Sequence, residues 1–349
     1  MGGTGDDGIG PRPRGDRIRW IGPVMAGSAL ALTVAMIAVG AFRTATPSRG
    51  SSAEAFAPSS TAPSVVVTPR PSADPEPRVL ADLSFVDIRS GRVTPLPRTV
   101  RSIEGLGRLD VSPDGARLAF DGTGGLYVAG IDGQDVRLIP FTAGASAPSW
   151  SHDGRKLVYG DGSRLFVVDL PTERVDRIAA HGTNVWYPNF SPDDRTIVFT
   201  KQAAGGLELW TVPVSGGHDS LLLRLDAPQT NAAFGTYSPQ GRIAFRLTQY
   251  DGVTVTQMTE ATVRIADADG EHRRPVADAP AWMSQIDPER LWPTWSPDGS
   301  AIAFERLYGR AVVIVDVRTG RLTKLGTGVD PVWLDNHTLI VEEYVPEGP

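Results

Sequence analysis

A unit of about 40 residues recurs along the second part of the sequence, and this periodicity limits the possible folds more than any other feature. The repeated segments read LDVSPDGARLAF (109–120), PSWSHDGRKLVY (148–159), PNFSPDDRTIVF (188–199), GTYSPQGRIAF (235–245), PTWSPDGSAIAF (293–304) and the degenerate PVWLDNHTLIVE (331–342). Successive units are spaced by 39, 40, 47, 58 and 38 residues, counted between the equivalent positions Ser112, Ser151, Ser191, Ser238, Ser296 and Leu334. Units of this length with several short strands each are typical of β-propellers.

Each unit contains the residues of a tight turn followed by those of a buried strand. An Asp side chain accepts hydrogen bonds from nearby backbone N–H groups and Gly tolerates a positive φ, so we expect the Asp-Gly pair to close a hairpin. The apolar run after the turn, such as Leu118-Ala119-Phe120, does not alternate with polar residues, which indicates a strand buried on both faces. Packing of blade against blade requires such strands. The turn residues with this structural role are Asp114, Gly115, Asp153, Gly154, Asp193, Gly241, Asp298 and Gly299.

The two ends of the repeat region complement each other. The last unit stops after Ile340-Val341, whereas the segment LSFVDIRSGRVTPL (83–96) matches the end of the fifth unit, VVIVDVRTGRLTKL (312–325). We therefore expect the N-terminal and C-terminal strands to complete one shared blade, which closes the ring and removes exposed sheet edges. The predicted fold is all-β: a six-bladed β-propeller over residues 79–346, preceded by one transmembrane helix.

An uncharged apolar segment runs from Trp20 to Phe42. About 20 helical residues cross the hydrocarbon core of a bilayer, so this segment is long enough to span it. Arginines precede it at positions 12, 14, 17 and 19, against 43 and 49 after it. The positive-inside rule then predicts a cytoplasmic tail over 1–19, a signal-anchor helix over 20–42 and a propeller outside the cytoplasmic membrane. The alternative is a cleaved signal peptide, for which Val39-Gly40-Ala41 would supply the small residues of a cleavage site.

Residues 43–78 are rich in Pro, Ser, Thr and Ala and contain almost no large apolar side chains. Such a segment cannot bury enough apolar surface to offset the entropy of ordering it. We expect a disordered, semi-extended linker that holds the propeller away from the membrane.

The recurring pattern W-S-P-D-G-x-x-[IL]-x-[FY], as in residues 295–304, resembles the TolB-type, WD40-like propeller repeat. The resemblance covers roughly residues 80–345. It implies a bacterial, extracytoplasmic propeller that binds protein partners across its channel face. The sequence departs from TolB in two respects, because it shows no N-terminal α/β domain and an anchor replaces the free periplasmic form. The particular partners of TolB are therefore not carried over.

No catalytic or metal-binding pattern stands out. The chain has no cysteine, no G-x-S-x-G nucleophile elbow, and five histidines without H-x-H or H-E-x-x-H spacing. Residues 267–271 resemble part of a calcium loop but lack its third acidic ligand, so a hairpin turn is the simpler interpretation. We therefore expect no catalytic residues, no metal and no cofactor. The net charge of −6 argues against a nucleic-acid partner.

The longer spacings between units indicate where a partner would bind. Extra residues occur around 249–260 and 279–291, and insertions in repeat proteins map to loops on one face, often the binding face. Aromatic side chains near these places are good anchors in recognition, with packing between blades as the alternative for each. The candidate partner-binding residues are Trp186, Tyr187, Trp282, Met283 and Trp292.

These observations favour a non-enzymatic binding or scaffold protein, held in the membrane by one helix. It would recognise a protein, peptide or envelope glycan at the loop-bearing face of the propeller. The alternative is a metal-dependent propeller hydrolase or lactonase that acts on a sugar-type substrate, with metal ligands dispersed over several blades. A sensor that signals through the short cytoplasmic tail is a third hypothesis.

Overall fold

The computed structural model describes residues 82–96, 106–178, 184–203, 206–225, 230–250, 258–277, 291–306 and 311–343. The expected cytoplasmic tail (1–19), signal-anchor helix (20–42) and linker (43–78) lie outside these ranges. Over the described ranges, no helix is both long and apolar enough to cross a bilayer.

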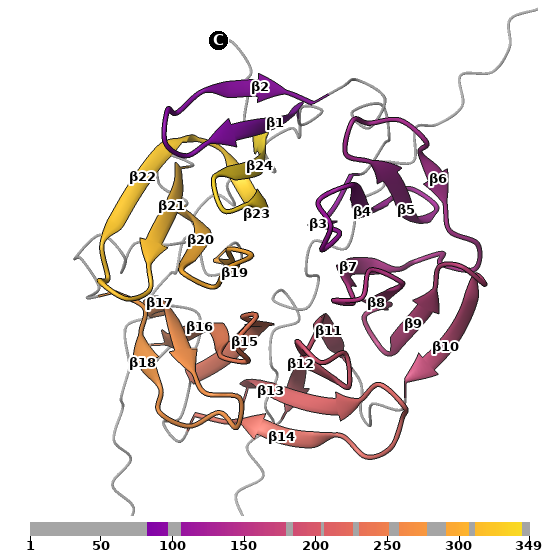
Figure 1. The fold of residues 1–349 in the computed structure, drawn as a ribbon. Coiled ribbons are helices and arrows are strands. Elements are labelled where there is room, and N and C mark those ends of the chain that lie inside the picture. The colour runs from indigo at the N-terminus through magenta and orange to yellow at the C-terminus, as the bar shows by residue number, and fades with distance from the viewer. Residues whose placement is uncertain are drawn as a thin grey trace, which may run out of the picture. The chain divides into compact units, whose positions relative to one another are not determined.

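The described residues form six four-stranded antiparallel sheets around a common axis, which is a six-bladed β-propeller (Figure 1). The all-β fold predicted from the repeat is confirmed. Blades 1 to 3 contain β3 (Leu109–Val111), β4 (Arg117–Gly122), β5 (Gly125–Gly130), β6 (Arg137–Leu138); β7 (Ser146–Trp150), β8 (Lys156–Gly160), β9 (Leu165–Asp169), β10 (Arg174–Ile178); and β11 (Val185–Phe190), β12 (Thr196–Ala203), β13 (Gly206–Pro213), β14 (Ser220–Leu223). Blades 4 to 6 contain β15 (Thr230–Tyr237), β16 (Ile243–Tyr250), β17 (Met258–Ala266), β18 (Arg274–Pro275); β19 (Thr294–Trp295), β20 (Ala301–Arg306), β21 (Ala311–Asp316), β22 (Leu322–Thr327); and β23 (Val329–Asp335), β24 (Thr338–Glu343), β1 (Asp82–Asp87), β2 (Val93–Pro95).

The sixth blade is shared between the two ends of the chain, as the sequence predicted. Its strand order is β2-β1-β24-β23. Strand β1 pairs antiparallel with β24 over six residues, from Asp82 opposite Glu343 to Asp87 opposite Thr338. This pairing closes the ring, so the facing edges of β1 and β24 are both hydrogen-bonded where the two ends of the propeller meet (Figure 1).

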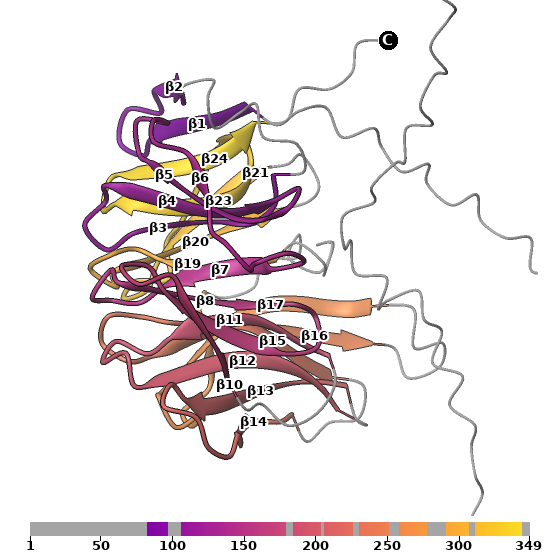
Figure 2. The same cartoon turned by 90° about the vertical axis from the view of Figure 1, so that its right-hand side faces the viewer.

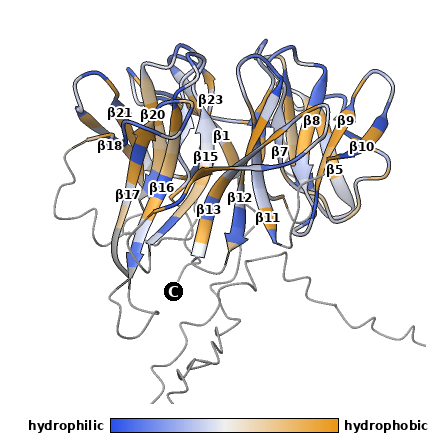
Figure 3. Ribbon diagram, turned by 90° about the horizontal axis from the view of Figure 1, so that it is seen from below, coloured by the Kyte–Doolittle hydropathy of each residue, from blue (hydrophilic) through white to orange (hydrophobic). Residues whose placement is uncertain are grey.

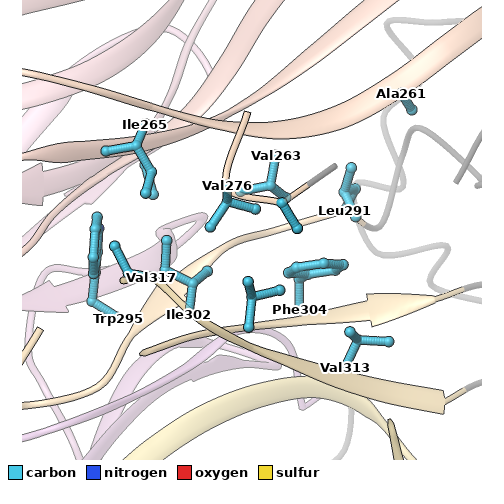
Figure 4. Packing of buried hydrophobic residues seen from close by; sticks show 13 residues of the cluster. Ala261, Val263, Ile265, Val276, Leu291, Trp295, Ile302, Phe304, Val313 and Val317 are labelled. Carbon is cyan, nitrogen blue, oxygen red and sulfur yellow. The ribbon is translucent and has the colours of Figure 1, made fainter. Parts of the chain in front are cut away.

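Apolar side chains fill the spaces between blades. The described residues contain six buried apolar clusters, and each joins one pair of neighbouring blades. Between blades 4 and 5, Val263 and Ile265 of β17 pack against Ile302 and Phe304 of β20 (Figure 4). The continuous apolar runs in the repeat thus supply the side chains that are buried on both faces of each blade. Figure 3 shows hydrophobic residues concentrated along the strands.

In blades 1, 2, 3 and 5, the turn after the inner strand is built around a Ser-x-Asp pair. In blade 1, Ser112 Oγ donates to Asp114 Oδ1 over 2.5 Å and accepts the backbone N–H of Arg117 over 2.9 Å. The same Ser-to-Asp hydrogen bond recurs in blades 2, 3 and 5. It holds the pKa of Asp114 below its usual range, together with the backbone N–H of Ala116. Gly115 closes the turn with a φ of 70°.

These turns give the propeller two distinct faces. We call the face that carries them the turn face, and the opposite face, where each inner strand begins, the loop face. Strands β16 and β17 form the longest hairpin and reach further along the ring axis than their neighbours (Figure 2). Because β16 runs away from its turn, this extension lies on the loop face, where the sequence places one of its insertions.

Replacing Phe199 with Ala should lower the free energy of unfolding by about 3 to 5 kcal/mol, because a fully buried ring between blades 2 and 3 leaves a cavity. Phe141→Ala provides the matched control, since the ring of Phe141 is 88% exposed and its loss should change the stability by less than about 0.5 kcal/mol. Urea denaturation followed by tryptophan fluorescence measures both. Equal effects of the two variants would contradict the assigned core.

Candidate functional site

One residue of each inner segment stands four positions before the turn serine or its equivalent. In five blades this residue lines a cavity at the ring axis, and in the sixth blade Asp330 lines a smaller cavity beside Arg108 and Trp292. In four blades this residue has a left-handed backbone, with φ of 52° at Ala147, 53° at Tyr187, 58° at Phe234 and 48° at Asp330. The pairing register shifts at the same place in all four inner strands, which identifies a repeated β-bulge. A bulge re-aims a side chain, here toward the axis. We call the six equivalent residues the channel ring: Arg108, Ala147, Tyr187, Phe234, Trp292 and Asp330.

Hydrogen bonds from the preceding blade fix two of these bulges. The backbone N–H of Ala147 donates to Asp121 Oδ1 over 3.0 Å, and that of Phe234 donates to Thr200 Oγ1 over 2.9 Å. Asp121 and Thr200 occupy equivalent positions on β4 and β12. A left-handed residue other than glycine costs about 1 to 3 kcal/mol and persists only where its surroundings determine it. Contacts between blades therefore hold the channel ring in its conformation.

Three aromatic members of the channel ring pack on one another. The ring centroids of Tyr187 and Phe234 lie 4.4 Å apart, and Trp292 lies 5.5 Å from each. Two guanidinium groups stack on this cluster, with Arg108 Cζ 4.1 Å from the Trp292 centroid and Arg246 Cζ 4.1 Å from the Phe234 centroid. Such cation–π contacts stabilise a buried cation.

A cavity of about 320 Å³ occupies the centre of the propeller, and all six inner segments contribute to its lining. Its wall includes Pro113, Pro239 and Pro297, which belong to the exposed turns of three blades. At its other end lie Arg108, Tyr187, Phe234 and Trp292. The cavity therefore opens on the turn face and has the aromatic cluster as its floor.

Polar side chains on the cavity wall tie neighbouring blades together. Asp110 Oδ2 accepts the backbone N–H of Trp150 over 2.8 Å. Asn189 accepts the backbone N–H of Tyr237 over 2.9 Å and donates to Ser149 Oγ over 3.0 Å. These side chains lie two positions before the turn serine in their units, so this position of the repeat serves ring assembly.

Two carboxylates near the floor have altered acidity. Burial raises the pKa of Asp110 to about 6, against the lowering effect of the backbone N–H groups of Trp150 and Val111. Burial also raises the pKa of Asp121 to about 6, against the backbone N–H of Ala147 and the nearby charge of Arg108. Part of the negative charge at the floor is therefore lost when the pH falls to about 6.

Comparison with known proteins identifies the fold. No protein-family model matches the chain. One sequence relative, an uncharacterised protein of Agrobacterium fabrum (strain C58), is 28% identical over 214 residues, which make up 57% of this chain and 69% of that protein. The solved structure of a putative TolB from Agrobacterium tumefaciens aligns with a TM-score of 0.59 at 16% identity, over 76% of this chain and 99% of that one. TolB from Acinetobacter baumannii aligns with a TM-score of 0.56 at 16% identity, over 73% of this chain and 67% of that one. The fold is TolB-like.

The TolB-like propeller brings together two of the five predicted partner-binding residues. Tyr187 and Trp292 meet at the cavity floor, 5.5 Å apart. Trp186 lies elsewhere, with its Nε1 beside Gly162 in the turn between β8 and β9 of the preceding blade. Trp282 and Met283 lie outside the described residues.

Sequence reasoning missed the other residues of the floor, namely Arg108, Phe234 and Arg246. The repeat offered a signal for the first two, because both stand four positions before a turn serine. At Phe234 the direction toward the axis depends on the bulge, which the residue type does not announce. In the part of the chain that the structure describes, no three His, Cys, Asp or Glu side chains converge as metal ligands would.

The free energy of unfolding of Asp110→Asn relative to that of the wild type should increase as the pH rises from 4.5 to 7.5, around a constant offset set by the loss of one of the two backbone N–H contacts of the carboxylate. The raised pKa of Asp110 means that the folded state holds the proton more tightly than the unfolded state, so ionisation above about pH 4 destabilises the wild type only. Between pH 4.5 and pH 7.5, the difference in free energy of unfolding between the variant and the wild type should change by about 2 to 3 kcal/mol at most. Denaturant titrations at fixed pH values measure it.

Asp193→Asn is the control for this titration. Hydrogen bonds from Ser191 lower the pKa of Asp193, so its stabilising ionisation is lost only as the pH falls below the range tested. The stability difference between Asp193→Asn and the wild type should therefore stay constant from pH 4.5 to 7.5. An equally constant difference for Asp110→Asn would refute the raised pKa of Asp110.

Proposed function

We propose that this chain is a non-enzymatic binding protein of the bacterial cell envelope, whose partner inserts an extended segment into the central cavity. The observation that carries this proposal is the cavity of about 320 Å³ with its aromatic floor. Ligand pockets span about 300 to 1,000 Å³ and combine apolar walls with a few polar groups, so the cavity has the size and lining of a binding site.

The strained backbone of the channel ring supports a binding role for this site. Left-handed residues other than glycine cluster at functional sites, where strain places side chains for recognition. Here four blades carry such a residue at one equivalent position, and each faces the axis. Tyr187 and Trp292 are also aromatic anchors of the kind that dominate binding energies.

The TolB-like fold supports a protein or peptide as the partner. The family resemblance of the repeat implies protein recognition in the envelope, and a narrow axial cavity favours a single extended chain over a folded surface. Whereas the sequence suggested the loop face as the binding face, the prolines at the cavity mouth favour entry from the turn face. The apolar segment 20–42 and the linker 43–78 would display the propeller on the outer side of the cytoplasmic membrane.

A photo-crosslinking amino acid at Pro297, at the mouth of the cavity, should capture a discrete envelope protein in growing cells. The same amino acid at Leu221, an exposed position on the outer strand β14, should not capture it. Combining Tyr187→Ala with Trp292→Ala should reduce the capture from Pro297 by tenfold or more, since aromatic anchors contribute about 2 kcal/mol or more each.

Two further variants locate the binding face. Trp186→Ala removes the neighbouring aromatic ring outside the cavity and should leave the capture unchanged. Phe141→Ser removes an exposed ring from the connection between β6 and β7, on the loop face. If capture depends on Phe141 but not on Tyr187 or Trp292, the cavity is not the binding site, and the result supports binding at the loop face.

The membrane topology is tested separately. Full-length protein should remain in the membrane fraction after alkaline extraction, and its propeller should be digested by protease added to spheroplasts. Its N-terminal sequence should precede Trp20. A mature N-terminus near residue 42 would instead establish a cleaved signal peptide.

A further inference from the structure

Among the described residues, three hydrogen-bond donors at the cavity floor have no acceptor: the Arg108 guanidinium, the Tyr187 hydroxyl and the indole N–H of Trp292. Arg108 Cζ lies 4.1 Å from the Trp292 ring centroid and 5.8 Å from that of Tyr187. Among the described residues, the guanidinium group of Arg108 forms neither a hydrogen bond nor an ion pair, and the Tyr187 hydroxyl forms no hydrogen bond. Both side chains are half-buried and line the cavity, so a ligand that reaches the floor meets two convergent donors.

The stacking of Arg108 favours a planar, anionic acceptor. The contact places Arg108 Cζ over the Trp292 ring and uses none of the guanidinium N–H donors in a hydrogen bond to a described residue. These donors match the two oxygens of a carboxylate, and the bidentate pair is among the strongest charge-assisted hydrogen bonds. A half-buried guanidinium without an acceptor costs free energy, which a bound carboxylate would recover.

The charges that face Arg108 are largely engaged in other contacts. Asp110 of β3 and Asp121 of β4 each accept backbone N–H groups of blade 2. Asp330 of β23 and Arg246 of β16 approach from the other side of the floor and carry opposite charges. The two buried carboxylates oppose an anion at neutral pH, and this opposition weakens as they become protonated near pH 6.

The wall above the floor favours a peptide over a sugar. Asp110, Asn189 and Thr236 already form inter-blade hydrogen bonds, so they offer few free groups to a ligand. The remaining wall contains six prolines, Val332 and the tryptophans Trp150, Trp295 and Trp333, together with the polar residues Ser149, His152 and Thr294. The hydroxyls of a sugar would be left unpaired there, at a cost of about 1 to 3 kcal/mol each, whereas apolar side chains of a peptide need no partner.

We propose that Arg108 and Tyr187 form a subsite for the C-terminal carboxylate of an extended peptide that enters the cavity from the turn face. This inference rests on the proposed binding function and names the part of the partner that is recognised. Trp292 and Asp110 are positioning residues: the first stacks on the guanidinium of Arg108 and the second ties the adjoining blade.

The test uses full-length protein in detergent and an array of hexapeptides tethered by their N-termini, with the last three residues varied. Each peptide is present with a free C-terminal carboxylate and as the C-terminal amide. The peptides that bind should bind ten- to a hundredfold more weakly as amides, because the amide loses the charge-assisted pair. Binders that are indifferent to amidation would overturn the inference and leave the proposed binding function standing.

Variants assign the effect to the two donors. Arg108→Gln should abolish the preference for the free carboxylate, Arg108→Lys should retain part of it, and Tyr187→Phe should reduce it less than Arg108→Gln does. Trp186→Ala should preserve it fully. Arg108→Lys and Tyr187→Phe are conservative changes, so they test the site even if Arg108→Gln lowers the stability.

Two additional measurements separate the remaining outcomes. Affinity for a free-carboxylate peptide should increase from pH 7.5 to pH 5.5, because Asp110 and Asp121 lose charge while a C-terminal carboxylate, with a pKa of about 3.5, stays ionised. Binding of a glucuronic-acid disaccharide in place of every peptide would overturn the peptide assignment. If no peptide binds and photo-crosslinking at Pro297 is independent of Tyr187 and Trp292, the proposed function itself fails.

Discussion

The pairing of β1 with β24 is the contact on which the rest of the propeller depends. It joins six residues near the N-terminal end of the described chain to the last six described residues and turns an open row of sheets into a ring. Because the ring is closed, each blade has a neighbour on both sides, and each of the six apolar clusters can bury residues from two blades. Without this pairing, blades 5 and 1 would lose the shared blade that packs between them.

Closure also explains why a strained inner surface is tolerated. The bulge that turns Tyr187 and Phe234 toward the axis places each residue in a left-handed conformation. Such a conformation needs constraint from outside the strand, and it comes from the adjoining blade, as in the hydrogen bond from the Phe234 N–H to Thr200. The framework positions of the repeat hold the ring together. The channel-ring position, in contrast, carries side chains that differ in size from that of Ala147 to that of Trp292, and the fold of the blades is the same. The contacts that stabilise the ring and the residues proposed to bind a partner therefore occupy different positions of the same 40-residue unit.

The fold was accessible from the sequence because its determinants are local and repeated. The Ser-x-Asp turn can be read in four of the six units, and the match between residues 83–96 and 312–325 predicted the shared blade. The site was only partly accessible. Tyr187 and Trp292 were selected because they are aromatic and lie near insertions, and the structure places them on the axis. Trp186 was selected by the same criterion, yet its side chain lies outside the cavity. Phe234 was missed because a bulge reverses the direction of a side chain without changing the residue type, and Arg108 was missed because it is neither aromatic nor close to an insertion.

The shared blade has a consequence for how the chain acquires its structure. Asp87 pairs with Thr338, about 250 residues later in the chain. Since synthesis proceeds from the N-terminus, β1 emerges early with an unpaired edge and must wait until almost the whole propeller has been made. Contacts between residues so distant in sequence form slowly, and an unpaired strand edge invites association with other chains during that interval. The last blade to form therefore contains the first two strands of the propeller to be made, and its assembly is the step at which a molecular chaperone would matter most.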